Sequence, residues 1–173
     1  MSGVSPDKLA SAELGSLNVS FDLYFLSLRP GETLRSALAR QEEAAGAQAA
    51  LDEADLARWD SVQAGVLALL PDAGIFQADA HRELSDDATG VQVSLFHGEL
   101  SLTVPYWYNG PDAQRLVALM RRVVLAIEEA TGLTAYDPQA DAPFIGSGDG
   151  VAAGTFDRVH DALVSRTDTA SPP

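Results

Sequence analysis

The amino-acid sequence predicts an α+β sandwich of the ferredoxin-like type, with an antiparallel or mixed sheet of about five strands and helices on one face. The prediction rests on an alternating segment over 19–25, a self-complementary hairpin pattern over 91–104, and a long amphipathic stretch over 111–131. In chain order we expect a strand, two helices, three strands, a helix and a strand, followed by a C-terminal helix.

The first strand and the first two helices follow from local patterns. Val19, Phe21, Leu23 and Phe25 alternate with polar residues, which is the period of a strand. Good helix formers over 32–43 predict a first helix. Apolar residues at three- and four-residue spacing predict a second one, for which Asp52 or Asp55 can serve as N-cap: Leu56, Trp59, Val66, Leu67 and Leu70.

The next segment holds the strongest pairing signal. Residues 75–78 suit a short strand, and residues 81–90 suggest a polar loop. If 91–96 and 99–104 pair across a two-residue turn at His97-Gly98, three apolar pairs share one face: Leu95 with Leu100, Val93 with Leu102, and Val91 with Val104. A slip of one residue would bury the polar set instead, so the register is well specified.

The second half begins with the most regular helix. Its apolar stripe is wide enough to cover a sheet face: Leu116, Leu119, Met120, Val123, Val124 and Ile127. Pro111 suits its first turn, Gly132 suits its C-terminal cap, and residues 133–136 suit one more strand. The expected division is a flexible leader (1–16), a single domain (17–139), a Gly/Pro linker (140–153), a terminal helix (154–166) and a disordered tail (167–173).

Two segments also carry a resemblance. The opening Phe21-Asp22-Leu23-Tyr24 and the segment Gly132-Leu133-Thr134-Ala135-Tyr136-Asp137-Pro138-Gln139 after the long helix resemble a set of small acidic bacterial proteins of unassigned function. The resemblance covers about residues 19–139 and brings no catalytic residues with it. Such proteins look like neighbours of polymorphic toxins, so the resemblance implies an immunity role as an expectation.

Composition and charge exclude several classes of function. Eleven basic residues against 25 acidic ones give a formal net charge of −14, which repels nucleic-acid phosphates, so we expect no nucleic-acid partner. The absence of cysteine excludes disulfides and thiolate chemistry. No apolar run is long enough to span a membrane, and the first residues lack a secretory pattern, so we expect a cytoplasmic protein without a membrane partner.

Catalytic and metal-binding motifs are also missing from the sequence. The histidines, His81, His97 and His160, lie apart and form no close ligand pair. The glycine-rich run at 146–150 lacks the lysine and the preceding strand of a phosphate loop, so a linker is the better interpretation. The sequence therefore predicts no catalytic residue, no metal and no cofactor, and favours a non-enzymatic protein.

An aromatic group supplies the partner-binding candidates. If the hairpin register continues, Tyr106 stays on the apolar face, Trp107 joins Phe96 on the opposite face, and Tyr108 lies at the entrance to the helix. These side chains either pack in the fold or form a partner anchor. The turn after the last strand offers a second choice, a simple Asx-Pro turn or a recognition edge that includes Asp137 and Gln139.

The leading hypothesis is a non-enzymatic interaction protein, most concretely an immunity-type inhibitor of a basic toxin domain, because acidic charge accelerates encounter with a basic target. One alternative is a small-molecule binder or an enzyme with a dispersed site of Asp, Tyr, Arg and His. The other is a structural or chaperone-like subunit that forms a homodimer.

Overall fold

The computed structural model describes residues 20–45, 50–96, 99–146 and 149–168. The predicted leader (1–16), the turn His97-Gly98 and the end of the tail lie outside these ranges. The strands are β1 (Ser20–Leu26), β2 (Gly74–Ala78), β3 (His81–Asp86), β4 (Val91–Phe96), β5 (Glu99–Pro105), β6 (Thr134–Asp137) and β7 (Ala142–Pro143). The helices are α2 (Leu34–Ala45), α3 (Glu53–Leu67), α4 (Gly110–Thr131) and α5 (Asp149–Asp168).

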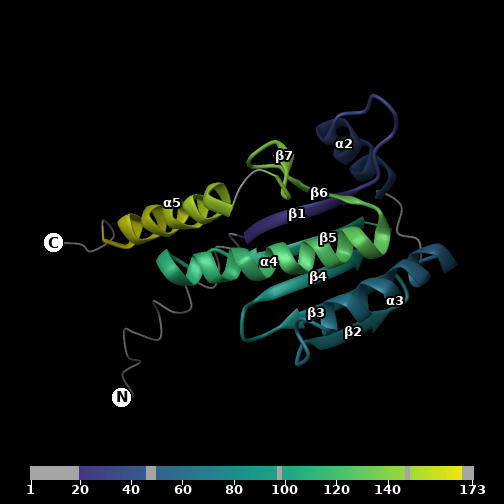
Figure 1. The fold of residues 1–173 in the computed structure, drawn as a ribbon, viewed down its shortest axis with the longest axis horizontal. Coiled ribbons are helices and arrows are strands. Elements are labelled where there is room, and N and C mark those ends of the chain that lie inside the picture. The colour runs from purple at the N-terminus through teal and green to yellow at the C-terminus, as the bar shows by residue number, and fades with distance from the viewer. Residues whose placement is uncertain (1–19, 46–49, 97–98, 147–148, 169–173) are drawn as a thin grey trace, which may run out of the picture.

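The predicted α+β class is confirmed, with a larger sheet than expected. Seven strands form one sheet in the order β2-β3-β4-β5-β1-β6-β7, and every neighbouring pair is antiparallel. The strands β4-β5-β1-β6, with α3 and α4 on one side of the sheet, repeat the ferredoxin-like pattern. In Figure 1, α4 runs in front of these strands, and α3 lies beside it in front of β2 and β3. The hairpin of β2 and β3 widens the sheet on one side, and β7 widens it on the other.

The predicted hairpin register is confirmed for the pairs from Gln92 with Thr103 to Phe96 with Glu99. Leu95 faces Leu100, Val93 faces Leu102, and the polar pairs alternate with them. The apolar members are buried on the face of the sheet that α3, α4 and α5 cover, the inner face. The polar members lie on the opposite face, the outer face. Burial of one face therefore sets this register, as the sequence pattern requires.

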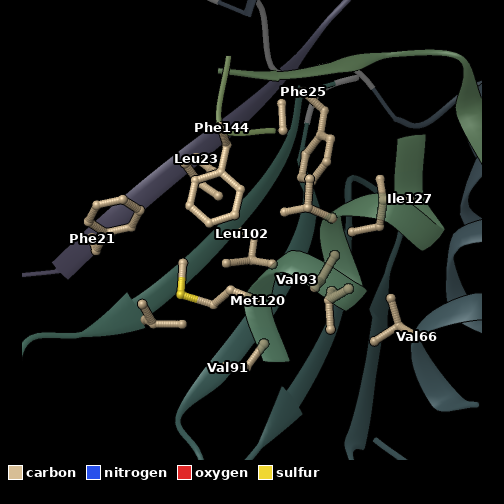
Figure 2. Packing of buried hydrophobic residues seen from close by; sticks show 14 of the residues in the cluster. Phe21, Leu23, Phe25, Val66, Val91, Val93, Leu102, Met120, Ile127 and Phe144 are labelled. Atoms are coloured by element: carbon tan, nitrogen blue, oxygen red, sulfur yellow. The ribbon is translucent and has the colours of Figure 1, made fainter. Parts of the chain in front are cut away.

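The core lies between the sheet and α3, α4 and α5. Phe21, Leu23 and Phe25 of β1 point from the sheet toward Met120 and Ile127 of α4 (Figure 2). Successive β1 residues alternate between the two faces of the sheet, so these three share the buried one. Val66 of α3 lies at one side of the same cluster, and Phe144, after β7, lies between Phe21 and Phe25 (Figure 2).

Helix ends follow the sequence signals. Asp52 is the N-cap of α3, its side chain accepts from the backbone N–H of Asp55 at 2.8 Å, and Asp55 completes a capping box. Gly132 ends α4 in the left-handed conformation, with φ of 69°, and Pro111 lies in the first turn of that helix.

One helix lies on the unexpected face. The prediction placed all helices on one side, but Ala37 of α2 packs with Leu26 and Tyr136, which point away from the main core. A salt bridge between Arg35 of α2 and Asp141, with 2.7 Å between the nearest N and O atoms, adds to this attachment, and the Tyr136 hydroxyl donates to Asp141 at 2.6 Å. Leu26 and Tyr136 give this corner of the outer face an apolar surface, and α2 covers it.

Two segments expected to be irregular are regular. The predicted polar loop at 81–90 contains β3, in which His81, Glu83 and Ser85 lie on the outer face, whereas Arg82, Leu84 and Asp86 lie on the inner one. The predicted linker at 140–153 contains β7 and the start of α5. The terminal helix is also integral to the core, because Phe156 is fully buried and stacks on Phe21 with ring centroids 5.3 Å apart.

Candidate functional site

The outer face of the sheet is the candidate site. This name covers side chains of the five strands β1, β2, β3, β4 and β5 that point away from α3, α4 and α5. Among the described helices, α2 alone packs on this side of the sheet, beside β1 and β6. The face comprises Ser20, Asp22 and Tyr24 of β1, Phe76 of β2, His81, Glu83 and Ser85 of β3, Gln92, Ser94 and Phe96 of β4, and Glu99, Ser101, Thr103 and Pro105 of β5.

The middle of the outer face is polar and acidic. Asp22 accepts hydrogen bonds from the Thr103 hydroxyl at 2.8 Å and the Ser20 hydroxyl at 2.9 Å. Burial raises the pKa of Tyr24, and the negative charges of Asp22, Glu99 and Glu42 raise it further. These charges therefore act together on one surface and disfavour an added negative charge there.

Glu99 lies within the same acidic surface. Burial raises the pKa of its carboxyl group, and the neighbouring charge of Glu42 on α2 acts in the same direction, while the nearby polar side chain of Gln41 opposes both. A cationic group placed beside Glu99 would relieve this repulsion. The electrostatics of the outer face thus favour a positively charged ligand.

One end of the outer face carries an exposed tryptophan. Trp107, directly after β5, is 67% exposed, the largest value among the exposed large apolar side chains of the described residues. Gly90 lies beneath it with φ of 68°, and a Cβ added there would lie 3.2 Å from Trp107 Cζ2 and 2.8 Å from Pro105 Cγ. The glycine therefore allows Pro105 and the indole to lie against the β3–β4 turn.

Tyr108 lies at the same end of the sheet as Trp107 and contacts the β3–β4 turn. Its hydroxyl donates to the backbone oxygen of Thr89 at 2.9 Å, and its ring lies 6.4 Å from that of Trp107. Tyr108 thus ties the entrance of α4 to the β3–β4 turn, while Trp107 is the more exposed of the two.

The other end of the outer face carries a row of rings. His81 lies between Phe76 and Phe96, with ring centroids 5.3 Å and 5.5 Å away and edge-to-face geometry on both sides. His81 Nε2 also lies 3.4 Å from a carboxylate oxygen of Glu83. Phe76 and Phe96 are both about half exposed. An aromatic surface with an adjacent carboxylate suits a Lys or Arg side chain.

The structure thus divides the predicted aromatic group. Phe96 ends β4 beside the β4–β5 turn, whereas Trp107 follows the far end of β5, so the length of the hairpin separates them. Phe96 lies on the outer face as expected, whereas β5 ends at Pro105, so the register does not extend to Trp107, and the two rings do not form one continuous patch. Each marks one end of an acidic surface.

The remaining sequence candidates have structural roles. Tyr106 is buried against Phe21 and Phe156, and its hydroxyl donates to Gln139 Oε1 at 2.7 Å. Burial raises the pKa of Tyr106, and the charges of Asp137 and Asp22 add to this, against the Gln139 hydrogen bond.

Asp137 is likewise buried, and its carboxylate accepts from the backbone N–H groups of Gln139 and Ala140 at 2.8 and 3.2 Å. This is the Asx turn that the sequence offered as one of two alternatives. Burial corrects the placement of Tyr106 and Asp137 among accessible partner-binding residues. Gln139 is exposed, and it serves as the hydrogen-bond acceptor of Tyr106.

A small cleft lies beside Tyr108, at the start of α4. It has a volume of about 230 Å³ and is lined by Ala88, Thr89, Tyr108, Asp112, Arg115, Leu116 and Leu119. This is below the roughly 300–1,000 Å³ of typical small-molecule pockets. Its charged residues, Asp112 and Arg115, are paired with each other, so the cleft offers little to a small polar ligand.

The histidines do not meet. His81 lies in β3, His160 Nε2 lies 2.9 Å from the Asn109 side-chain nitrogen, and His97 falls outside the described ranges. Within the described ranges, no three His, Asp or Glu side chains gather as metal ligands would. Over the same ranges, no helix is long and apolar enough to cross a bilayer.

Comparison with known proteins identifies no relative of this chain. No family model, no curated protein and no solved structure matches the chain. The outer face is therefore interpreted from its own residues.

Sequence reasoning missed Phe76, His81 and Glu83 as parts of one surface. The segment 81–90 looked like a loop because it is polar, and Leu84 is the only large apolar residue in β3. Since Arg82 and Asp86 are polar although they share a face with Leu84, the segment has no apolar–polar alternation that could have identified the strand.

Proposed function

We propose that this protein binds a basic protein partner through its outer face, most concretely as an immunity-type inhibitor that neutralises a basic toxin domain. The observation that carries the proposal is Trp107, which is two-thirds exposed although Pro105 and Gly90 lie against it. Tryptophan is among the residues most enriched in the energetic centres of protein interfaces.

The position of Trp107 favours recognition over packing. Its ring leaves most of its apolar area in water, while the contacts beneath it restrict its motion before any partner arrives. An anchor that is already held loses less conformational entropy on binding, so more of its buried area contributes to affinity. Phe76 and Phe96 provide a second exposed aromatic group at the far end of the same face.

Charge supports a basic partner. The chain has a net charge of −14, and three carboxylates lie close to Tyr24, whose pKa is raised by burial first and then by the charges of Asp22, Glu99 and Glu42. A field of this sign accelerates encounter with a positively charged protein and slows encounter with an acidic one. Binding should therefore weaken as salt concentration rises.

The test is photo-cross-linking in the cells from which the sequence comes. A photoreactive phenylalanine analogue replaces Trp107 in one variant and Leu125 in a matched control, because Leu125 is also exposed but lies on α4. We expect position 107, and not 125, to cross-link to a protein of basic isoelectric point. A cross-link at 107 no stronger than at 125, or one to an acidic protein, would contradict the proposal.

The inhibitory part of the proposal has its own readout. The cross-linked partner is expressed alone in a laboratory host, and then together with this chain. We expect the partner to arrest growth and the chain to restore it, with Trp107→Ala losing most of the rescue. If the partner is harmless when expressed alone, the chain would still be a binding protein, but the proposed immunity role would be refuted.

A further inference from the structure

The two edges of the sheet differ in how well they are protected. β7 is a two-residue strand that ends in Pro143, which cannot donate to a further strand. The opposite edge, β2 (Gly74–Ala78), is five residues long, carries no charge and no proline, and all five residues are exposed. Natural edge strands are usually protected from pairing with another chain by charged residues, prolines, bulges or a covering segment. β2 contains neither a charged residue nor a proline.

The backbone of β2 has groups available for another strand. The turn Asp79-Ala80 joins Ala78 and His81, the last pair of the β2–β3 ladder. In such a two-residue hairpin the residues that flank the turn form a hydrogen-bonded pair, and bonded and non-bonded pairs then alternate. It follows that Ile75 and Gln77 direct their N–H and C=O groups away from β3, toward the open edge.

The side chains around this edge define what would fit. Phe76 lies on the outer face, opposite Glu83 of β3 and beside His81. Ile75 lies on the other face, opposite Leu84, and is about half exposed. An added strand would place alternate side chains against these two surfaces. Aliphatic residues suit Ile75, and Lys or Arg suits the face of Phe76 and the carboxylate of Glu83.

The charges near β2 select the occupant. Asp72 precedes the strand, Asp79 follows it, both are exposed, and Glu83 lies across from its centre. The basic side chain beside them is Arg82, across from Gln77, and its guanidinium donates to the backbone oxygens of Ala78 and His81. A second copy of this chain would bring the same carboxylates against these and would add its own net charge of −14. A strand rich in Lys or Arg would instead pair with them. Electrostatics therefore favour a segment of a different, basic protein.

We propose that β2 binds an extended, basic segment of the partner as an added strand at the edge of the sheet, with aliphatic side chains on the Ile75 side and cationic side chains on the Phe76 side. This assignment rests on the proposed function in one respect, that the partner is basic. Backbone hydrogen bonds would supply affinity, and the two side-chain surfaces would supply selectivity.

The test uses synthetic peptides and amide NMR spectra of the full chain. The probe is a short capped peptide in which lysine and valine alternate. Two controls have the same length: one carries N-methyl groups on the backbone nitrogens that would pair with β2, and the other replaces lysine with glutamate. We expect the probe to shift the amide signals of Ile75 and Gln77 and to slow their hydrogen exchange. The N-methylated peptide should bind at least about tenfold more weakly, and the glutamate peptide should bind weakest of the three.

A variant provides an independent check. Gln77→Pro removes one N–H group that points to the open edge, and an edge strand tolerates proline at such a position. The amide signals of β4 and β5 should therefore stay in place, while the affinity for the probe peptide falls. Equal binding of the N-methylated peptide, or shifts confined to residues away from β2, would overturn the proposal. Shifts of Ile75 and Gln77 that grow with chain concentration alone would also overturn it, because the occupant would then be a second copy.

The outcomes separate this inference from the proposed function. Cross-linking at position 107 without binding of the probe at β2 would leave the basic partner in place and remove the added strand. Binding of the probe at β2 without a cross-link at 107 would retain the strand-binding edge and contradict the assignment of Trp107 as the anchor.

Discussion

Replacing Trp107 with alanine tests the assignment of the outer face, because it separates a binding anchor from a structural residue. The chain has two tryptophans in contrasting environments, Trp107 at 67% exposure and Trp59 of α3 at 1%. Trp59 packs in the core, and its indole N–H donates to Gln63 at 3.1 Å. It is therefore the natural comparison for the same substitution.

The expected magnitudes follow from buried area. A large aromatic side chain buries at most about 250 Å², and about one third of Trp107 is covered, which corresponds to roughly 80 Å². At about 25 cal/mol per Å² this gives about 2 kcal/mol. Residual burial in the unfolded chain lowers the figure to about 1.5 kcal/mol. Trp59→Ala should instead cost about 3–5 kcal/mol, as truncation of a core aromatic residue does.

Urea unfolding of the two single variants measures this difference directly. If Trp59→Ala does not fold, Trp59→Phe leaves Trp107 as the remaining tryptophan, and its fluorescence should be that of an indole in water and readily quenched by acrylamide. A loss of about 3 kcal/mol or more for Trp107→Ala, or a shielded indole in Trp59→Phe, would refute the reasoning. Trp107 would then be part of the fold, and the proposed anchor would be lost.

Three further predictions concern charge, α5 and the turn beneath the indole. Hydrogen bonds from the Arg40 side chain and the Arg29 backbone lower the pKa of Glu32 from 4.5 to about 2. The stabilisation from Glu32 should therefore be complete above pH 4.5 and disappear as the pH falls toward 2, and an NMR titration of Arg40→Gln should show the Glu32 pKa returning toward 4.5. Phe156→Ala should cost about 3–5 kcal/mol in urea unfolding, and a cost below about 1 kcal/mol would mean that α5 is only appended to the domain. Gly90→Ala combines a φ of 68° with a Cβ 2.8 Å from Pro105, so it should cost about 1–3 kcal/mol and change the fluorescence of Trp107; an unchanged emission would contradict the close packing described here.

Sequence periodicity was most informative where one face of an element is buried along its whole length. The β4–β5 register and the apolar stripe of α4 are of this kind, because a single face of each contributes buried residues at regular spacing. Caps were predictable for a related reason. Asp52 acts through its side chain and Gly132 through its backbone conformation, each on the adjacent helical turn, so neither depends on distant contacts.

The candidate site was only partly predictable. The hairpin register placed Phe96 on the outer face, but Tyr106 and Asp137 turned out to be buried. The burial of Tyr106 depends on Phe156 of α5, which is distant in sequence. Asp137 is buried where its carboxylate accepts from the backbone of the turn that follows it, one of the two alternatives that the sequence had left open. Polar composition also concealed β3, since a strand with one face in water needs only a buried Leu84 to hold its place.

The sequence by itself determined most of the local elements, apart from β3, β7 and the start of α5, as well as how β4 pairs with β5 and how strongly negative the chain is. Only the tertiary structure decided that β1 inserts between β5 and β6 and that β2 is left at the edge with all its residues exposed. It also decided that α2 packs on the face of the sheet opposite to α3, α4 and α5. The physical reason is that a local pattern reports which side of an element is apolar. The identity of its neighbours, and hence which strand ends the sheet, depends on packing between segments far apart in the chain.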